Sequence, residues 1–176
     1  MKNLLSSRRL RLESLEERTL LAVTAGLAET AALAAPTGAT NWVVNTADDP
    51  SSWSDTDGEV SLREAIGRAQ TGDTITFDES LSGDTVTLNG NQFEVNKAIT
   101  IDATSIGGIT IDADGQSRVF YISGGTADTP VNLVALTITG GYASEIWSGT
   151  WVGGGGICNE GVLALTDCTV TGNSVN

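Results

Sequence analysis

The 176-residue sequence contains no histidine, two cysteines and three prolines. Without histidine, neither a Ser/His/Asp or Cys/His catalytic arrangement nor an imidazole metal site can be built within the chain. Cys158 and Cys168 are ten residues apart, a spacing that matches no CxxC redox or zinc motif. Two buried thiols are the favoured interpretation, and one disulfide formed outside the cytosol is the alternative.

Basic residues are scarce beyond Pro36, where four of them stand against eighteen acidic residues and the net charge is −14. A charge of this size repels nucleic-acid phosphates and anionic membrane surfaces, so we expect no nucleic-acid partner. The sequence also lacks a run of about 20 apolar residues, and we therefore expect no transmembrane span.

Residues 1–35 differ in composition from the rest and hold five of the nine basic residues. A cluster of arginines precedes a short apolar stretch at 20–28, and small residues at 32–34 offer a cleavage site, which is the order of an export signal. Acidic residues among the arginines depart from that pattern, and an amphipathic helix is the alternative. The segment RRLRLESLEERTLLA resembles the LExLExRxLLA segment of large exported proteins of planctomycete-type bacteria. That resemblance implies a secreted or cell-surface protein.

One helix is predicted in the body of the chain, within SLREAIGRAQTGD. Ser61 can serve as the N-cap and Glu64 can return a bond to it, as in the S-x-x-E capping box. Gly72 is expected to end the helix, because glycine readily adopts the left-handed conformation at a helix C-terminus. Apolar residues repeat at helical spacing and give the helix one face to bury, made of Leu62, Ala65, Ile66 and Ala69. We expect this helix to cap the first coil of the strands that follow.

Glycine is abundant, with 21 residues, and it punctuates many short segments in which apolar and polar residues alternate. This pattern predicts half-buried strands joined by tight turns. The expected strands are Trp42–Asn45, 73–77, 84–88, 92–95, 98–102, 108–112, 117–122, 131–139 and 162–171.

Internal repetition distinguishes a solenoid from a sandwich or barrel. LTITGG at 136–141 returns as CTVTGN at 168–173, and ITIDA occurs at both 99–103 and 109–113. Self-similar units predict coils that cover one another. We expect Leu136 to lie above Cys168 and Ile138 above Val170 in the interior, with the intervening threonines outside. Gly140 and Gly172 would occupy turns that require positive φ.

The motifs SLREAI, ITIDA, LTITGG and GGGICNEGVLALTDCTVTGNS resemble right-handed parallel β-helix proteins of bacterial surfaces. Those proteins carry an SLREA-type N-terminal motif, and related short repeats mark the polymorphic outer-membrane proteins within the wider pectate-lyase-like class. The resemblance covers residues 42–176. Family members usually have a cysteine before SLREA, whereas Val60 stands here.

The repeats and this resemblance together predict an all-β fold, namely a right-handed parallel β-helix with an N-terminal capping α-helix. Because no polar capping repeat or helix follows the last coil, we expect this solenoid to be truncated at its C-terminal end. The implied organisation is an export or sorting segment at 1–35, a linker at 36–41, a strand, loop and capping helix at 42–72, and incomplete coils at 73–176. An uncovered last coil would permit self-association through strand addition.

Enzymes of this fold class are polysaccharide lyases and glycoside hydrolases, which use paired carboxylates, Ca²⁺ or a basic residue. The corresponding candidates are Asp102, Asp112, Asp114 and Arg118. Asp112 and Asp114 could share a Ca²⁺ ion, but they also fit ordinary turn chemistry before Gly115, which we favour. An EF-hand-like spacing of Asp55, Asp57 and Glu64 places Trp53 where the first ligand belongs, so we do not favour calcium there.

Trp147 and Trp151 lie in a glycine-rich insertion, where indoles can stack on a sugar ring, contact a partner, or pack on the solenoid wall. We expect a non-enzymatic secreted or cell-surface module, such as an adhesin or stalk, without a cofactor. The alternative is a carbohydrate-active β-helix enzyme or its inactive relative. The expected partner is a glycan or another surface protein.

Overall fold

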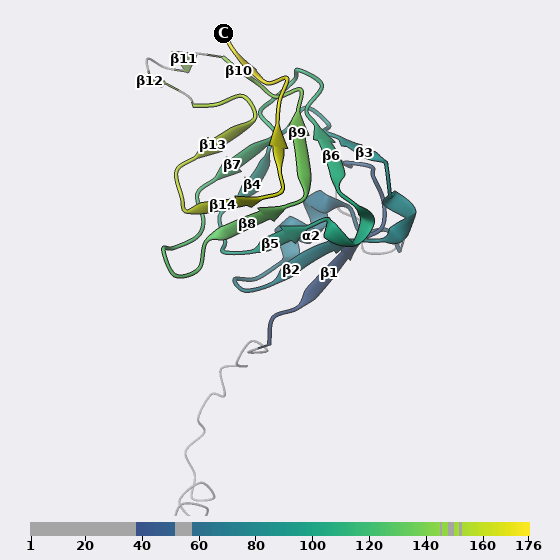
Figure 1. Ribbon diagram of the computed structural model, residues 1–176. Coiled ribbons are helices and arrows are strands. Elements are labelled where there is room, and N and C mark those ends of the chain that lie inside the picture. Colours follow the sequence, from purple (N-terminus) through teal and green to yellow (C-terminus); the bar gives the residue numbers. More distant parts are fainter. Residues whose placement is uncertain (1–37, 52–57, 145, 148–149, 152) are drawn as a thin grey trace, which may run out of the picture. The chain divides into compact units, whose positions relative to one another are not determined.

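The computed structural model describes residues 38–51, 58–144, 146–147, 150–151 and 153–176. Within this part the chain is predominantly β-strand with one α-helix, which confirms the expected all-β class at that level (Figure 1). The expected export segment at 1–35 and the acidic residues Asp55 and Asp57 lie outside the described residues.

Three parallel sheets make up most of the structure. The first sheet has the order β1 (Asn41–Val44), β2 (Thr74–Phe77), β5 (Thr100–Asp102), β8 (Val131–Val134) and β14 (Leu163–Thr166). The second has the order β3 (Thr85–Thr87), β6 (Ile109–Asp112), β9 (Leu136–Thr139) and β15 (Thr169–Val170). The third has the order β4 (Phe93–Val95), β7 (Phe120–Ile122) and β13 (Ile157–Asn159).

The chain visits these sheets in a constant order. From β2 the chain continues to β3 in the second sheet and β4 in the third, and then returns to the first sheet at β5. We call one such circuit through the three sheets a pass, and the later passes follow the same order. Two further strand pairs are short: β10 (Tyr142–Ala143) runs parallel to β16 (Ser174–Val175), and β11 (Ile146–Trp147) runs antiparallel to β12 (Thr150–Trp151). Single 3₁₀ turns occur at η1 (Glu79–Leu81) and η2 (Thr104–Ile106).

Strand register reproduces the 32-residue sequence repeat. Thr137 pairs with Thr169, and Ile138 pairs with Val170. Gly140 and Gly172 both have φ of 64°, as their turn positions require. The ITIDA repeat does not mark strands that pair with each other, because its two copies lie in different sheets, in β5 and β6.

Two strands that the sequence predicts as continuous, 131–139 and 162–171, are each broken in two. The breaks fall at Ala135 and Asp167, whose φ values are 57° and 52°. At both residues the chain turns from the first sheet to the second. The buried residues change phase at the first break, since Leu133 and Leu136 are both buried although three positions apart. A straight strand cannot bury both, so the backbone must bend between them.

The α-helix α2 (Leu62–Arg68) begins with the predicted capping box. Ser61 Oγ accepts from the Glu64 N–H at 3.2 Å, and Glu64 Oε2 accepts from the Ser61 N–H at 2.9 Å. At the other end, Lys97 Nζ donates to three carbonyl oxygens that the helix leaves unpaired, those of Ile66, Gly67 and Ala69, at 2.7–3.0 Å. The helix is therefore closed at both termini by side chains.

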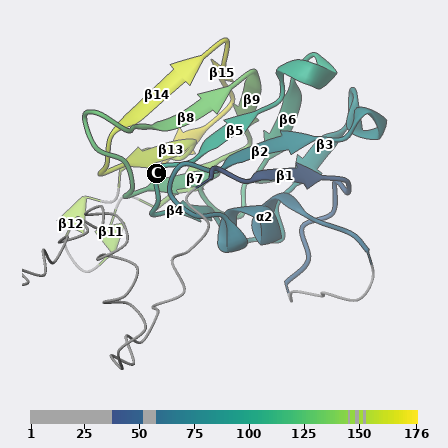
Figure 2. The ribbon, with the colours of Figure 1, turned by 90° about the horizontal axis from the view of Figure 1, so that it is seen from below.

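The apolar face of α2 packs against β1, β2 and β4, the first strands of the first and third sheets. Figure 2 shows α2 beside β1, at the end of the first sheet opposite β14. All four predicted face residues are buried: Leu62, Ala65, Ile66 and Ala69. At the opposite end, Val162, Leu165 and Val170 are exposed. No helix of the described residues is long and apolar enough to cross a membrane.

Both cysteines are free thiols in the structure. Cys158 is buried, and Cys168 is half-buried with its Sγ 3.2 Å from the Leu133 carbonyl oxygen. Burial of the first as a small apolar residue matches the favoured interpretation from the sequence.

Candidate functional site

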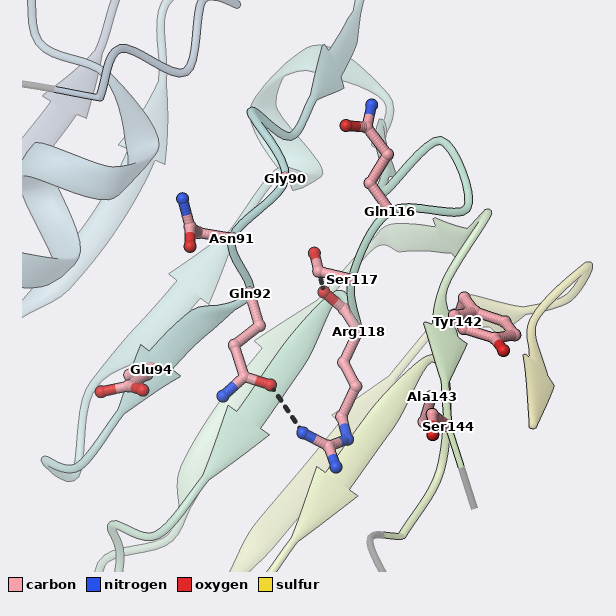
Figure 3. Close-up of a pocket in the computed structure, with 10 residues that line it drawn as sticks. All are labelled: Gly90, Asn91, Gln92, Glu94, Gln116, Ser117, Arg118, Tyr142, Ala143 and Ser144. Carbon is pink, nitrogen blue, oxygen red and sulfur yellow. Dashed lines mark hydrogen bonds between the residues drawn. The ribbon is translucent and has the colours of Figure 1, made fainter. Parts of the chain in front are cut away.

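A groove of about 480 Å³ opens where three successive passes of the chain leave the second sheet (Figure 3). Each pass contributes one segment to its lining. The segments are 90–94, which leads into β4, 116–118, which leads into β7, and 142–144, which includes β10. The lining side chains are mostly polar: Asn91, Gln92, Glu94, Gln116, Ser117, Arg118, Tyr142 and Ser144.

A pair of side chains from neighbouring passes occupies the centre of the groove. Arg118 Nη1 donates to Gln92 Oε1 at 3.0 Å, and Figure 3 shows the two side chains lying side by side. The Arg118 backbone is also fixed, because its carbonyl oxygen accepts from Ser117 Oγ at 2.8 Å. Tyr142 N–H then donates to the Ser117 carbonyl oxygen at 2.8 Å and links the third pass to the second. The three passes therefore hold one another in place.

Three further polar groups of the lining are available for hydrogen bonding, as far as the described residues show. Within the described part of the chain, Gln92 Nε2, the Glu94 carboxylate and Tyr142 Oη make no hydrogen bond to protein. They supply a donor, an acceptor and a group that does both. The groove thus offers hydrogen-bonding capacity beside a pair that is already organised.

The wall formed by residues 89–92 is braced from outside the groove. Arg63, on α2, forms an ion pair with the buried Asp49, with 2.6 Å from Nε to Oδ1 and 2.7 Å from Nη2 to Oδ2. The same guanidinium donates to the carbonyl oxygens of Asn91 and Gln92 at 2.6 and 3.0 Å. Asp49 Oδ2 in turn accepts from the Asn89 N–H at 2.9 Å.

The Arg63 guanidinium also makes a cation–π contact, because it lies 4.6 Å from the centre of the Phe93 ring. Phe93 is itself buried and packs against Phe120 of the next pass. A cation over an aromatic face in a partly buried place adds to the ion pair. The helix, the preceding loop and the groove wall are therefore one connected unit.

The three aspartates singled out from the sequence lie in turns and do not line the groove. Asp102 Oδ1 accepts from the Thr104 N–H at 2.8 Å, where η2 begins. Asp112 Oδ1 accepts from the Asp114 N–H at 2.8 Å, and Asp114 Oδ2 accepts from Gln116 Nε2 at 3.3 Å. These are the bonds that turn-forming aspartates make. Arg118, the fourth candidate, does line the groove.

Asp102 and Asp112 stand at the ends of strands in different sheets, and each accepts a hydrogen bond within its own turn. Among the described residues, no group of three or more Cys, Asp or Glu side chains is arranged to hold a metal ion. Glu64 is part of the EF-hand-like spacing, but its Oε2 accepts from the Ser61 N–H in the helix cap. Its Oε1 lies 3.8 Å from Arg68 Nη2 and forms an ion pair with it.

Trp147 and Trp151 belong to the antiparallel pair β11–β12, in which Trp147 is opposite Thr150 and Trp151 is opposite Ile146. Their side chains lie outside the described part of the structure. The interpretation of these indoles as sugar-stacking or partner-contacting groups stays a prediction.

Two titrating groups near the sheets have pKa values displaced from the ordinary range. The N–H groups of Gln70 and Thr40 donate to the Asp73 carboxylate at 2.8 and 2.7 Å and hold its pKa below the usual value. The Tyr121 hydroxyl donates to Glu160 at 2.7 Å, and this bond raises the pKa of Tyr121. Glu94 pairs with Tyr121 in strand register.

The lining residues Gln92, Gln116 and Tyr142 carry no sequence motif, and only strand register brings them together. Residues paired between neighbouring passes are 25 positions apart at Thr85–Thr110, 27 at Phe93–Phe120 and 32 at Thr100–Asn132, so no constant repeat length marks the alignment in the sequence. Comparison of the chain with protein-family models, with curated proteins and with solved structures found no match.

Proposed function

We propose that the described chain is a right-handed parallel β-helix, closed at one end by α2, and that it acts as a non-enzymatic binding module of a secreted or cell-surface protein. The β-helix assignment is supported by the constant order in which the chain visits three parallel sheets. It is also supported by the capping position of α2 against the first strands. Export is supported by the order of residue types in 1–35.

The observation that carries the binding function is the polar groove that spans three passes. Its centre is held by the Gln92–Arg118 hydrogen bond, and nearby are Gln92 Nε2, the Glu94 carboxylate and Tyr142 Oη, which make no hydrogen bond to the described residues. Concave sites with a few fixed polar groups are where proteins generally bind ligands. A rigid β scaffold that presents such a groove suits attachment to a surface.

Binding is favoured over turnover by the distribution of carboxylates. Glycoside hydrolysis uses two carboxyl groups that flank the scissile bond. Among the described residues, Glu94 is the single carboxylate that lines this groove, while Asp102, Asp112 and Asp114 are engaged in turns outside it. This arrangement supports a module that holds its partner without cleaving it.

The experiment that tests this function measures attachment and turnover together. The purified chain is incubated with bacterial cell-envelope preparations and with a panel of polysaccharides, with and without Ca²⁺. We expect attachment that Gln92→Ala weakens and the distant Gln70→Ala does not, with no released product. Turnover that Asp112→Ala abolishes would instead establish the carbohydrate-active alternative. Export is checked separately by mass spectrometry of secreted material, which should begin near Ala35.

A further inference from the structure

The charges of the groove indicate the kind of ligand that it accepts. Among the residues that the structure describes, the lining contains one cationic side chain, Arg118, and one anionic side chain, Glu94. These two charges offset each other, and the Arg118 guanidinium already donates to Gln92. The chain beyond Pro36 carries a net charge of −14, which repels a polyanion at long range. A neutral ligand avoids both this repulsion and the cost of desolvating an unbalanced charge.

The polar groups of the lining match a ligand rich in hydroxyls. The lining side chains include three amides and three hydroxyls: Asn91, Gln92, Gln116, Ser117, Tyr142 and Ser144. A sugar hydroxyl both donates and accepts, and amide side chains present a donor and an acceptor side by side. Gln92 is suited to this, because its Oε1 is held by Arg118 while its Nε2 makes no bond within the described protein.

An extended peptide is a poorer match for the same groove. Peptides that bind to β proteins commonly add a strand to an exposed sheet edge. The strands next to the groove, β4 and β7, are paired with each other inside the third sheet, and β7 is also paired with β13. Backbone groups of the lining are likewise engaged, as in the Tyr142–Ser117 bond. β4 is the end strand of the third sheet and is in contact with α2. Among the described residues, the groove therefore offers mainly side chains to a ligand.

The spacing of the lining matches a linear chain of rings. Neighbouring parallel strands are about 4.8 Å apart, so the three lining segments repeat at about that distance along the direction in which the passes stack. One hexose ring in a linear glycan extends over a comparable length. A volume of about 480 Å³ is also within the usual range for ligand sites.

We propose that this groove binds a neutral oligosaccharide of about two or three sugar residues, which lies along the stacking direction of the passes. The Gln92–Arg118 pair contacts the central ring, and Gln116 and Tyr142 contact the neighbouring rings. This inference rests on the proposed binding function and adds the class of ligand.

The test is a calorimetric titration of the full chain with neutral trisaccharides, namely mannotriose, xylotriose and cellotriose, and with trigalacturonate as the acidic counterpart. We expect saturable binding of at least one neutral trisaccharide and weaker binding of trigalacturonate. Gln92→Ala should weaken neutral binding about tenfold, as expected for the loss of one well-placed hydrogen bond. Gln70→Ala is the matched control, because Gln70 is an exposed glutamine outside the groove.

Thermal unfolding of both variants shows whether each is folded, and Gln92→Asn serves as a second groove variant if Gln92→Ala is not. Tighter binding of trigalacturonate, or neutral binding that groove variants leave unchanged, would overturn the inference while leaving the proposed binding function intact. Absence of binding to every trisaccharide would also overturn it. The proposed function itself fails only if attachment to cell envelopes is absent as well.

Discussion

Arg63 and Asp49 form a two-point ion pair, with 2.6 and 2.7 Å between guanidinium nitrogens and carboxylate oxygens. The Asp49 side chain is 1% exposed and that of Arg63 is 21% exposed. Through Arg63 the pair also holds the carbonyl oxygens of Asn91 and Gln92. The loop before the capping helix is thereby tied to the wall of the groove, 40 residues further along the chain.

Asp49→Asn should destabilise the protein by about 1–3 kcal/mol, because it removes the charge from a buried pair whose partner cannot lose its own. Urea unfolding of this variant and of Asp48→Asn measures the effect. Asp48 is the neighbouring exposed aspartate, so its variant should unfold at the wild-type midpoint. Equal urea midpoints for the two variants would show that the Arg63–Asp49 ion pair does not stabilise the folded protein.

Asp73 should make stability depend on pH in the acidic range. Its folded pKa is lowered by N–H donors from Gln70 and Thr40. A lowered folded pKa adds stability above the ordinary pKa of about 4, and this contribution is lost as the pH falls through the folded value. The difference in unfolding free energy between wild type and Asp73→Asn should therefore be largest near pH 7 and shrink toward pH 3. Urea midpoints across that range check the prediction, which a pH-independent difference would contradict.

Gly140→Ala should be more damaging than an alanine at another turn glycine. Gly140 has φ of 64°, and the Asp112 carboxylate lies directly against the place that a Cβ would take. Gly83 also has positive φ, but its Cβ position has no atom within 4 Å. Gly83→Ala therefore isolates the backbone cost of about 1–2 kcal/mol. Gly140→Ala should cost at least about 1 kcal/mol more, since Asp112 must move and lose its bond to Asp114. Comparable denaturant midpoints would refute the contact.

The 176-residue chain should self-associate as its concentration rises. Leu165 on β14 and Val170 on β15 are 46% and 49% exposed, and these strands are the last of the first and second sheets among those described. An exposed apolar strand edge is a template for pairing with another chain. Leu165→Lys should shift light scattering toward the monomer. Val43→Lys, at an exposed valine near the helix-capped end, should have a smaller effect.

The sequence was most informative where one residue type is needed for a local reason. Ser61 and Glu64 predicted the start of the helix because their side chains satisfy backbone groups three residues apart. The repeat of LTITGG and CTVTGN predicted the pairing of Ile138 with Val170, because equal spacing puts equivalent residues in register. In both cases the determining contacts are short in sequence or exactly periodic.

The bends and the groove were harder to predict. Ala135 is not a residue type that marks positive φ, and the only signal was the phase change between Leu133 and Leu136. The Gln92–Arg118 pair joins residues 26 positions apart, and unequal connections between passes hid their alignment. Two closely spaced carboxylates such as Asp112 and Asp114 fit either a cation site or a turn in the sequence, and the hydrogen bonds that they accept are those of a turn.

Chemical-shift mapping by NMR can show whether the groove binds a neutral oligosaccharide without cleaving it, because it locates the ligand and reports its fate in one sample. The chain is titrated with the neutral trisaccharide that binds best, and both protein and sugar signals are followed. We expect chemical-shift changes concentrated in residues 90–94, 116–118 and 142–144, with the sugar intact at the end. Shifts concentrated elsewhere, around Asp102 for example, or the appearance of cleaved sugar, would contradict it.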